Sequence, residues 1–303
     1  MDKYRGLEKI VSTDRIKYNE PMSKYTTMKV GGPCDAIVFP KSVEEIKDII
    51  NYCKENNVSY YVIGNGSNLL VKDEGIRGLV IKVSYRFSDI NADGEKITVL
   101  AGATMPSLSQ IAKKNSLQGL EFSCGIPGTV GGGIKMNAGA YGSQISDVLL
   151  DVTYIDDKLN IKTIKNEECN FGYRKSIFVD NPSYVIISAT FKLKKGNTED
   201  ITNKMKENSD ARKEKQPLEY PNFGSVFKRP EGYFVGKLVD DAGLRGYIIG
   251  GAQVSTKHTG FIVNIDKATC KDVLELIKHV QDTIYNKFNV MLTTEVVIIG
   301  GEK

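Results

Sequence analysis

The sequence predicts a mixed α+β fold of more than one domain, and three observations support this. The chain has 303 residues, more than a single hydrophobic core usually serves. Helical and strand-like periodicities follow one another without a regular βαβ order. Residues 197–215 are almost entirely polar, which is typical of a surface helix that links two domains.

The first third of the chain is predicted to contain two helices among short strands. Ser42 and Glu45 form a capping-box signature, and apolar residues then recur on one helical face. Thr104 and Pro106 indicate the start of a second helix over 105–115. Short apolar runs bounded by glycine or polar residues predict strands at 60–64, 78–83 and 96–103.

The rest of the chain continues this mixture. Alternating apolar and polar residues predict antiparallel strands at 151–156, 161–164 and 184–193. A helix near 233–242 is expected to stop at Gly243, and strands are expected around 247–264. A long helix begins with the capping box of Thr269 and Asp272. The sequence closes on a predicted strand, "TTEVVIIG".

Composition restricts the class of protein. The 41 basic and 37 acidic residues leave a net charge of +4, which predicts no nucleic-acid binding but suits anionic small ligands. The five cysteines are scattered without metal-ligand spacing, so we expect free thiols in a reducing compartment and no metal site. The charged N-terminus and the lack of a long uncharged run predict a cytoplasmic protein without membrane insertion. No obligate protein partner is evident.

Two glycine-rich loops are the most informative local feature. "GNGSNLL" (64–70) directly follows a predicted strand, and "GIPGTVGGGIKMNAGAYG" (125–142) has seven glycines in eighteen residues. Neither has the spacing of a Walker or Rossmann loop. A single loop of this kind is usually a tight turn. Two in one region favour a ligand with a pyrophosphate and a flat group lying along bare backbone.

These loops belong to a series of motifs with a recognisable order. The others are "TMKVGGPCDAIVFP", "FGYRKSIF", "YPNFGSVFKRP", "LVDDAGLRG" and "TTEVVIIG". The chain from about residue 20 onward resembles the UDP-N-acetylenolpyruvoylglucosamine reductase family. The resemblance implies a two-lobed FAD-binding region of the vanillyl-alcohol-oxidase/PCMH-like type, followed by an α+β substrate-binding domain.

The resemblance also implies domain boundaries. Residues 1–90 are expected to form the first FAD-binding lobe, joined by the terminal strand at 291–303. Residues 91–195 are expected to form the second lobe, and residues 196–290 the substrate-binding domain. Only His258 and His279 are histidines, and both lie outside the predicted FAD-binding lobes. Histidyl attachment of the flavin is therefore excluded there, and we expect FAD to bind non-covalently.

The resemblance assigns FAD contacts to both glycine loops. The first loop contributes Gly64, Asn65, Gly66, Ser67 and Asn68. The second contributes Gly125, Pro127, Gly128, Thr129, Gly131, Gly132, Asn137, Ala138 and Gly139. By the same resemblance the enzyme uses NADPH to reduce an enolpyruvyl ether of UDP-N-acetylglucosamine to UDP-N-acetylmuramate, a precursor of the bacterial cell-wall peptidoglycan.

Three residues match the catalytic positions of the family. Arg174 matches an arginine whose planar guanidinium can grip a carboxylate through two hydrogen bonds. Ser225 matches the proton donor, since a carbanion-like centre needs only a well-placed hydroxyl. Glu295 matches a glutamate that stabilises or protonates the intermediate, and it is expected to open the strand "EVVII".

Substrate contacts are expected from Tyr141, Lys215, Lys228 and Arg229. The three cations flank the serine loop and suit the UDP phosphates, and Tyr141 suits the nucleotide sugar. Many members of the family carry asparagine where this chain has Arg229. The segment between Arg174 and Ser225 lacks the tyrosine-loop insertion of the longer class, so the chain resembles the shorter class.

Two alternative functions remain open from the residues. A flavin-dependent oxidase of the same FAD-binding fold would share the glycine loops but would pass electrons rapidly to oxygen. A noncatalytic nucleotide-sugar binding protein would contain no flavin.

Overall fold

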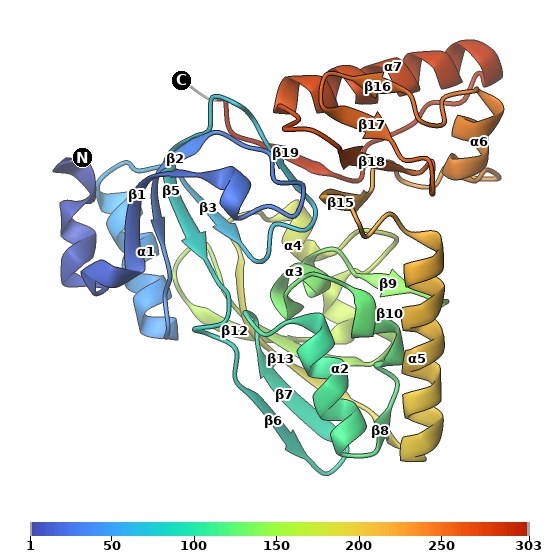
Figure 1. Ribbon diagram of the computed structural model, residues 1–303. Helices are drawn as coiled ribbons and strands as arrows, with labels where there is room; N and C mark the ends of the chain where they lie inside the picture. The colour runs from blue at the N-terminus through green and yellow to red at the C-terminus, as the bar shows by residue number, and fades with distance from the viewer. Residues whose placement is uncertain (1, 302–303) are drawn as a thin grey trace. The chain divides into compact units, whose positions relative to one another are not determined.

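The computed structural model describes residues 2–301, which pack into two compact units (Figure 1). Unit 1 consists of the chain up to Lys17, Ala36–Asn65 and Leu79–Arg212. Unit 2 consists of Tyr18–Asp35, Gly66–Gly78 and the chain from Lys213 onward. Residues 91–195 thus lie wholly in unit 1, whereas residues 1–90 divide between the two units. The polar helix after residue 197 packs mainly with unit 1 rather than with the C-terminal region.

Unit 1 contains a five-stranded antiparallel sheet in the order β12-β11-β13-β7-β6. Its strands are β6 (Ile90–Asp93), β7 (Lys96–Leu100), β11 (Leu149–Ile155), β12 (Ile161–Lys165) and β13 (Val185–Lys192). Val152, Ala189 and Val99 stand opposite one another on the three central strands, and all three are buried. Such cross-strand rows fix the register, because a one-residue slip would turn them outward. The predicted antiparallel strands are confirmed.

A second sheet has the order β1-β2-β5-β3. Its strands are β1 (Ile16–Pro21), β2 (Pro33–Val38), β3 (Tyr60–Ile63) and β5 (Ile76–Lys82). The boundary between the units falls within β1, β2 and β5, which explains why residues 1–90 do not form one unit. β3 and β5 are parallel, and β3 ends directly before Gly64. Two short pairs in unit 1 join β8 (Leu117–Gln118) to β14 (Lys194–Lys195) and β9 (Gly139–Ala140) to β10 (Ser143–Gln144).

The helices begin largely where the capping residues predict. Unit 1 contains α1 (Val43–Glu55), α2 (Met105–Lys114), α3 (Val130–Lys135), α4 (Ile177–Asp180) and most of α5 (Thr198–Lys215). The short 3-10 helices are η1 (Asp2–Lys9), η2 (Thr13–Arg15), η3 (Met22–Lys24), η4 (Glu121–Gly125), η5 (Ile145–Asp147) and η6 (Asn166–Cys169). Thr104 accepts a hydrogen bond from the backbone N–H of Ser107, as a helix N-cap does. No helix within residues 2–301 is long and apolar enough to span a bilayer.

Only half of the first predicted capping box forms. Ser42 Oγ accepts from the backbone N–H of Glu45, but the Glu45 carboxylate does not return to Ser42. It binds the guanidinium of Arg15 through both oxygens, at 2.6 and 2.8 Å. Because Arg15 is buried, its charge requires a close anion, and this non-local pair takes the place of the local one.

Unit 2 has its own sheet and core. Its antiparallel sheet runs β15-β18-β17-β16, with β15 (Asn222–Ser225), β16 (Ile248–Ile249), β17 (Ala252–Val254) and β18 (Phe261–Asn264). Helices α6 (Val235–Asp241) and α7 (Cys270–Phe288) accompany it (Figure 1). α7 buries Val273, Ile277, Val280 and Ile284 in the core, as its periodicity predicts. β4 (Leu69–Val71) pairs in parallel with β19 (Val297–Ile299).

The N-terminus of α7 is held from two directions. Thr269 and Asp272 form the complete predicted capping box. In addition, the carboxylate of Asp73 accepts from the backbone N–H groups of Cys270 and Lys271, at 2.8 and 2.9 Å. The segment that follows the first glycine loop is therefore fastened directly to α7.

We expect Asp272→Ala to lower the free energy of unfolding at neutral pH by about 1 kcal/mol, because the cap is lost. A hydrogen bond from the backbone N–H of Thr269 is the main cause that lowers the pKa of Asp272. This carboxylate therefore stabilises the fold above its unfolded-state pKa, and the contribution disappears as the pH falls through the lowered folded-state pKa. Chemical denaturation at neutral and acidic pH should show the parent and variant converging in acid. A constant difference across that range would contradict the assignment.

Candidate active site

The two glycine loops meet inside unit 1. Asn65 Nδ2 donates a hydrogen bond to the carbonyl of Pro127, at 3.1 Å. A Cβ atom placed on Gly64 would lie 2.2 Å from Thr129 Oγ1, closer than any real Cβ contact. Glycine at position 64 thus permits the close approach of the loops. Asn65 and Pro127 are distant in sequence but adjacent in space.

A cleft opens beside this contact. Thr129 and four other residues of the two glycine-rich stretches line it, namely Gly64, Gly131, Gly132 and Lys135. The remaining lining residues come from strands β3 and β13 and from segments next to strands: Val62, Ile63, Val83, Ala101, Pro182, Tyr184, Val185 and Ile186. The cleft combines apolar walls with bare backbone, which suits a flat heterocyclic group.

Glycine has a different role at each of two adjacent positions. Both belong to α3 and neither has a positive φ. A Cβ on Gly131 would approach Ala101 Cβ to 3.0 Å, so glycine there allows α3 to pack on the strand end. A Cβ on Gly132 would meet only Thr129 Oγ1, at 3.5 Å. Gly132 therefore keeps space in the cleft open.

The other predicted cofactor residues of the second loop shape the chain around the cleft without lining it. Gly128 accepts at its carbonyl from Met105 N–H, and Ala138 donates from its N–H to Gly133. Gly139 pairs with Gln144 in the β9–β10 hairpin. A Cβ on Gly125 would lie 2.8 Å from the Cδ atom of Arg212.

Asn137 connects the second glycine loop to the predicted catalytic arginine. Its side chain is buried, and its Nδ2 donates to the carbonyl of Gly172 at 3.2 Å. Its Oδ1 accepts from the backbone N–H of Ser146. On the other side of the turn, Ser176 Oγ donates to the carbonyl of Lys135 at 2.7 Å. The turn that carries Arg174 is thus tied at both ends to the glycine-rich stretch.

Arg174 occupies a strained backbone position within this turn. Its φ is +55°, which costs a non-glycine residue of order 1 kcal/mol and is often found at functional sites. Gly172 and Lys175 exchange backbone hydrogen bonds across it. The guanidinium lies over the Tyr173 ring, with its Cζ 5.0 Å from the ring centroid. The sequence therefore presents an arginine at the tip of an anchored turn.

Unit 2 brings Ser225 and Glu295 into adjacent segments. Ser225 ends β15, stands opposite Phe261 of β18 and is exposed. The carbonyl of the next residue, Val226, accepts from the backbone N–H of Glu295 at 2.8 Å. Phe227 and Thr294 form a β-bridge between the same segments.

Glu295 does not open the final strand as predicted. β19 begins at Val297, because residues up to Glu295 pair with the Ser225 segment, whereas Val297 donates to the carbonyl of Asn68. Asn68 Nδ2 also donates to the carbonyl of Glu295, at 3.1 Å. Glu295 thus stands where the chain passes from one pairing to the next, beside the second half of the first glycine loop.

That half-loop is closely packed. Gly66 has a φ of +64°, and a Cβ there would lie 2.2 Å from the carbonyl oxygen of Tyr25. Ser67 follows it and is half-buried. Only glycine fits at position 66, so the predicted loop conformation depends on this residue.

The predicted substrate residues are spread over both units. Lys228 is half-buried and its N–H donates to the carbonyl of Thr293. Arg229 is exposed; its Nε donates to the carbonyl of Tyr233, and it stacks over the Phe234 ring at 3.9 Å. Lys215 is exposed at the end of α5. In unit 1, the hydroxyl of Tyr141 donates to the carbonyl of Asn208.

Two lysines beside the glycine loops were not among the sequence predictions. Burial lowers the pKa of Lys82 to about 8, and its Nζ donates to the carbonyl of Gly64 at 2.7 Å. Burial also lowers the pKa of Lys135, which lines the cleft. The signal for Lys135 was present in the sequence as the single charge within the glycine-rich stretch.

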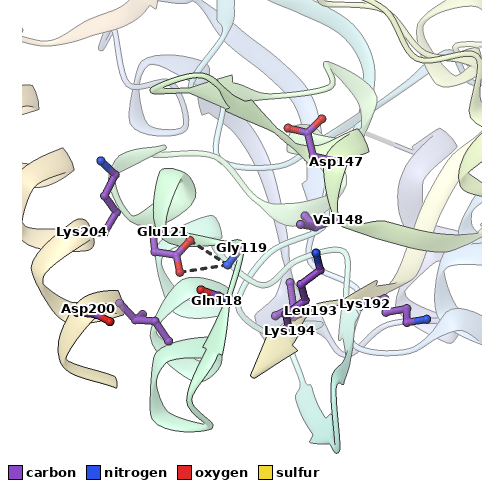
Figure 2. Close-up of a pocket in the computed structure, with 11 residues that line it drawn as sticks. Gln118, Gly119, Glu121, Asp147, Val148, Lys192, Leu193, Lys194, Asp200 and Lys204 are labelled. Carbon is purple, nitrogen blue, oxygen red and sulfur yellow. Dashed lines mark hydrogen bonds between the residues drawn. The ribbon is translucent and has the colours of Figure 1, made fainter. Parts of the chain in front are cut away.

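Unit 1 has another, larger cavity of about 590 Å³, which contains none of the predicted site residues. Figure 2 shows charged side chains of both signs around it, among them Asp147, Lys194 and Lys204. Both carboxylate oxygens of Glu121 accept from the backbone N–H of Gly119 there. Because predicted cofactor residues line the smaller cleft and none lines this cavity, they favour the smaller cleft as the cofactor site.

Comparisons with known proteins agree with this arrangement. Residues 33–164 match the model of an FAD binding domain. Residues 216–299 match the model of the UDP-N-acetylenolpyruvoylglucosamine reductase C-terminal domain. These matches confirm an FAD-binding region followed by a separate α+β domain.

Relatives and a solved structure match over nearly the whole chain. UDP-N-acetylenolpyruvoylglucosamine reductase of Clostridium novyi is 48% identical, covering 100% of this chain and 98% of that protein. The Clostridium perfringens protein of the same name is 46% identical, covering 100% and 99%. The crystal structure of UDP-N-acetylenolpyruvylglucosamine reductase from Thermus caldophilus is 37% identical with a TM-score of 0.82, covering 94% of this chain and 98% of that one. The chain therefore belongs to the UDP-N-acetylenolpyruvoylglucosamine reductase family and is an FAD-containing oxidoreductase.

Proposed function

We propose that this enzyme reduces the enolpyruvyl group of UDP-N-acetylglucosamine-enolpyruvate to UDP-N-acetylmuramate, with NADPH as the reductant. The observation that carries the proposal is the joining of the cleft to the Arg174 turn within unit 1, through Asn137 and Ser176. The names of the relatives support the same substrate. We further propose that the reaction serves peptidoglycan precursor synthesis in the cytoplasm.

We assign the non-covalent FAD to the cleft between the glycine loops. The residues fit the group, because Gly132 leaves the backbone bare and the walls are apolar. When bound, the flavin supplies the hydride for the reduction. The two histidines belong to unit 2, and neither is among the residues that line the cleft.

Arg174 is proposed to hold the substrate carboxylate. Hydride addition to the enolpyruvyl double bond moves negative charge toward that carboxylate, and a guanidinium fork stabilises the charge through two parallel hydrogen bonds. The tie between the turn and the glycine stretch holds the backbone that carries Arg174, which limits the reorganisation needed during the reaction.

Ser225 is proposed to donate the proton that completes the reduction, from its Oγ to the carbon next to the carboxylate. Glu295 is proposed to stabilise the intermediate or to support this transfer. The adjacent backbone pairing of their segments supports a shared role. A hydroxyl is a weak acid, but the carbanion-like centre is a strong base, so position matters more than acidity.

We propose that Lys215, Lys228 and Arg229 contact the UDP diphosphate and that Tyr141 contacts the nucleotide sugar. Asn137 is proposed to position the Arg174 turn, because its side chain already binds protein groups. The match of residues 216–299 to the family's C-terminal domain supports a substrate-binding domain that follows α5.

An anaerobic experiment tests the proposed function. NADPH should bleach the flavin absorbance of the purified protein, and addition of the enolpyruvyl nucleotide should restore it with formation of UDP-N-acetylmuramate. Flavin that NADPH does not reduce, combined with rapid oxygen consumption on an alcohol, would favour an oxidase. A colourless protein without flavin would favour a noncatalytic binder.

We expect Gly132→Val to reduce FAD affinity by about tenfold or more, because the new side chain enters the cleft and overpacks it. Folding should be little affected, because the Cβ meets only Thr129 at an ordinary distance. The measurements are the flavin-to-protein ratio and thermal unfolding. Gly94→Asn is the control, since it adds a side chain in open space at a turn that asparagine tolerates. Unchanged flavin content in Gly132→Val would show that the cofactor does not occupy this cleft.

A further inference from the structure

Lys135 is the one charged side chain among the residues that line the cleft. It is the last residue of α3, and its carbonyl is fixed by the hydrogen bond from Ser176 Oγ. Within residues 2–301, no carboxylate or other acceptor lies at hydrogen-bonding distance from its ammonium group. The structure thus holds a half-buried cation toward the cleft without a protein partner.

A partly buried ammonium group without a partner destabilises the ligand-free protein, because the charge has lost part of its hydration. Burial is the only cause that shifts its pKa, and the shift is downward, so no neighbouring charge compensates the loss of water. No lining residue carries a carboxylate, and only Thr129 and Tyr184 among them carry a hydroxyl group. An anion that entered this apolar surrounding would gain more from the lysine than it would at an exposed surface.

The neighbouring Lys82 has a different role. It is also half-buried, but its Nζ donates to the carbonyl of Gly64 and so supports the first glycine loop. The hydrogen bond to Gly64 therefore explains why a lysine is buried at position 82, whereas no such bond among the described residues explains the burial of Lys135.

We propose that the ammonium group of Lys135 pairs with the diphosphate of FAD and determines a large part of the cofactor's affinity. The diphosphate is the only anionic group of oxidised FAD, so it is the partner that a buried cation requires in that state. This inference rests on the assignment of FAD to the cleft between the glycine loops.

The test measures FAD affinity rather than turnover. Full-length protein is freed of flavin with a chaotropic salt, and FAD is titrated back while its fluorescence quenching is followed at low and high ionic strength. Lys135→Met should weaken FAD binding by about 10- to 100-fold, as expected for loss of a charge-assisted hydrogen bond. It should also reduce the salt dependence of the dissociation constant. Lys135→Arg keeps a cation and should retain both affinity and salt dependence within a few-fold.

Lys114→Met is the matched control, because it removes an equal charge from an exposed position on α2. Its FAD affinity should equal that of the parent. Thermal unfolding of the flavin-free variants separates folding from binding, and Lys135→Met should be at least as stable as the parent since a buried charge is removed.

Three results would overturn the inference. Equal FAD affinity in the parent and Lys135→Met would show that the lysine makes no contact. Weaker binding with an unchanged salt dependence would show contact with a neutral part of the cofactor. A flavin-free Lys135→Met chain that is clearly less stable than the parent would assign the lysine to folding. Failure of the parent itself to bind FAD would instead refute the cofactor assignment on which the inference rests.

Discussion

Ser225→Ala is expected to slow reoxidation of the reduced enzyme by the enolpyruvyl nucleotide by well over about 10²-fold, the lower range for loss of a general acid. Flavin content, folding and reduction by NADPH should be nearly unchanged. Ser225 is exposed, and within the described residues no hydrogen bond involves its Oγ. Removing the hydroxyl therefore leaves no protein group unsatisfied.

Single-turnover reoxidation of the pre-reduced enzyme without oxygen isolates the step. A run in deuterated solvent shows whether protonation limits the rate. Ser225→Cys retains a donor and should recover part of the rate, and Ser59→Ala, another exposed serine, should match the parent. If Ser225→Ala reoxidises within about a few-fold of the parent, the proton comes from Glu295 or from water.

Arg174→Lys is expected to slow the same half-reaction by about 10²-fold or more, because the lysine keeps the charge but loses the planar fork. Reduction of the flavin by NADPH should persist at nearly the parent rate. The backbone strain at φ +55° is the same for arginine and lysine, so the turn should keep its shape. Stopped-flow measurement of the two half-reactions separates these effects.

The neighbouring Lys175→Met is the control for Arg174. It removes a cation whose ion pair with Asp180 is long, at 3.9 Å, and exposed, so the rate should change little. Equal loss of both half-reactions in Arg174→Lys, or loss of FAD, would assign Arg174 to cofactor binding or to folding instead of to the substrate carboxylate.

Elements with strong local signals were predictable from the sequence. The capping box of Thr269 and Asp272 and the apolar face of α7 depend on residues within a few positions of one another. Glu45 shows where such reasoning fails. Ser42 was predicted correctly as the N-cap of the helix. The carboxylate of Glu45, however, binds Arg15, thirty positions away. A pattern of neighbouring residues cannot show that a distant arginine binds the carboxylate in place of the Ser42 backbone.

The candidate site was predictable as a set of motifs but not as an arrangement. The contact of Gly64 with Thr129 depends on how two distant segments fold together, which no local sequence pattern shows. The place of Glu295 before the final strand depends on two distant segments, because its N–H donates to Val226 and its carbonyl accepts from Asn68. The sequence shows Lys135 as the single charge of the glycine-rich stretch. Its position in the cleft without a protein partner among the described residues, which suggests a role in ligand binding, comes from the structure.

The bond between Asp73 and the start of α7 has a consequence for synthesis of the chain. Asp73 and Cys270 are 197 positions apart, and a ribosome adding about 5–20 residues per second needs roughly 10–40 s to span that distance. During this interval the segment around Asp73 has been made but lacks its partner. Unit 1 draws on nothing beyond Arg212, so it can fold while the C-terminal helix is still being translated. Unit 2 cannot complete its core before α7 is made, because early residues such as Met28 and Leu70 share that core with Val273 and Ile277.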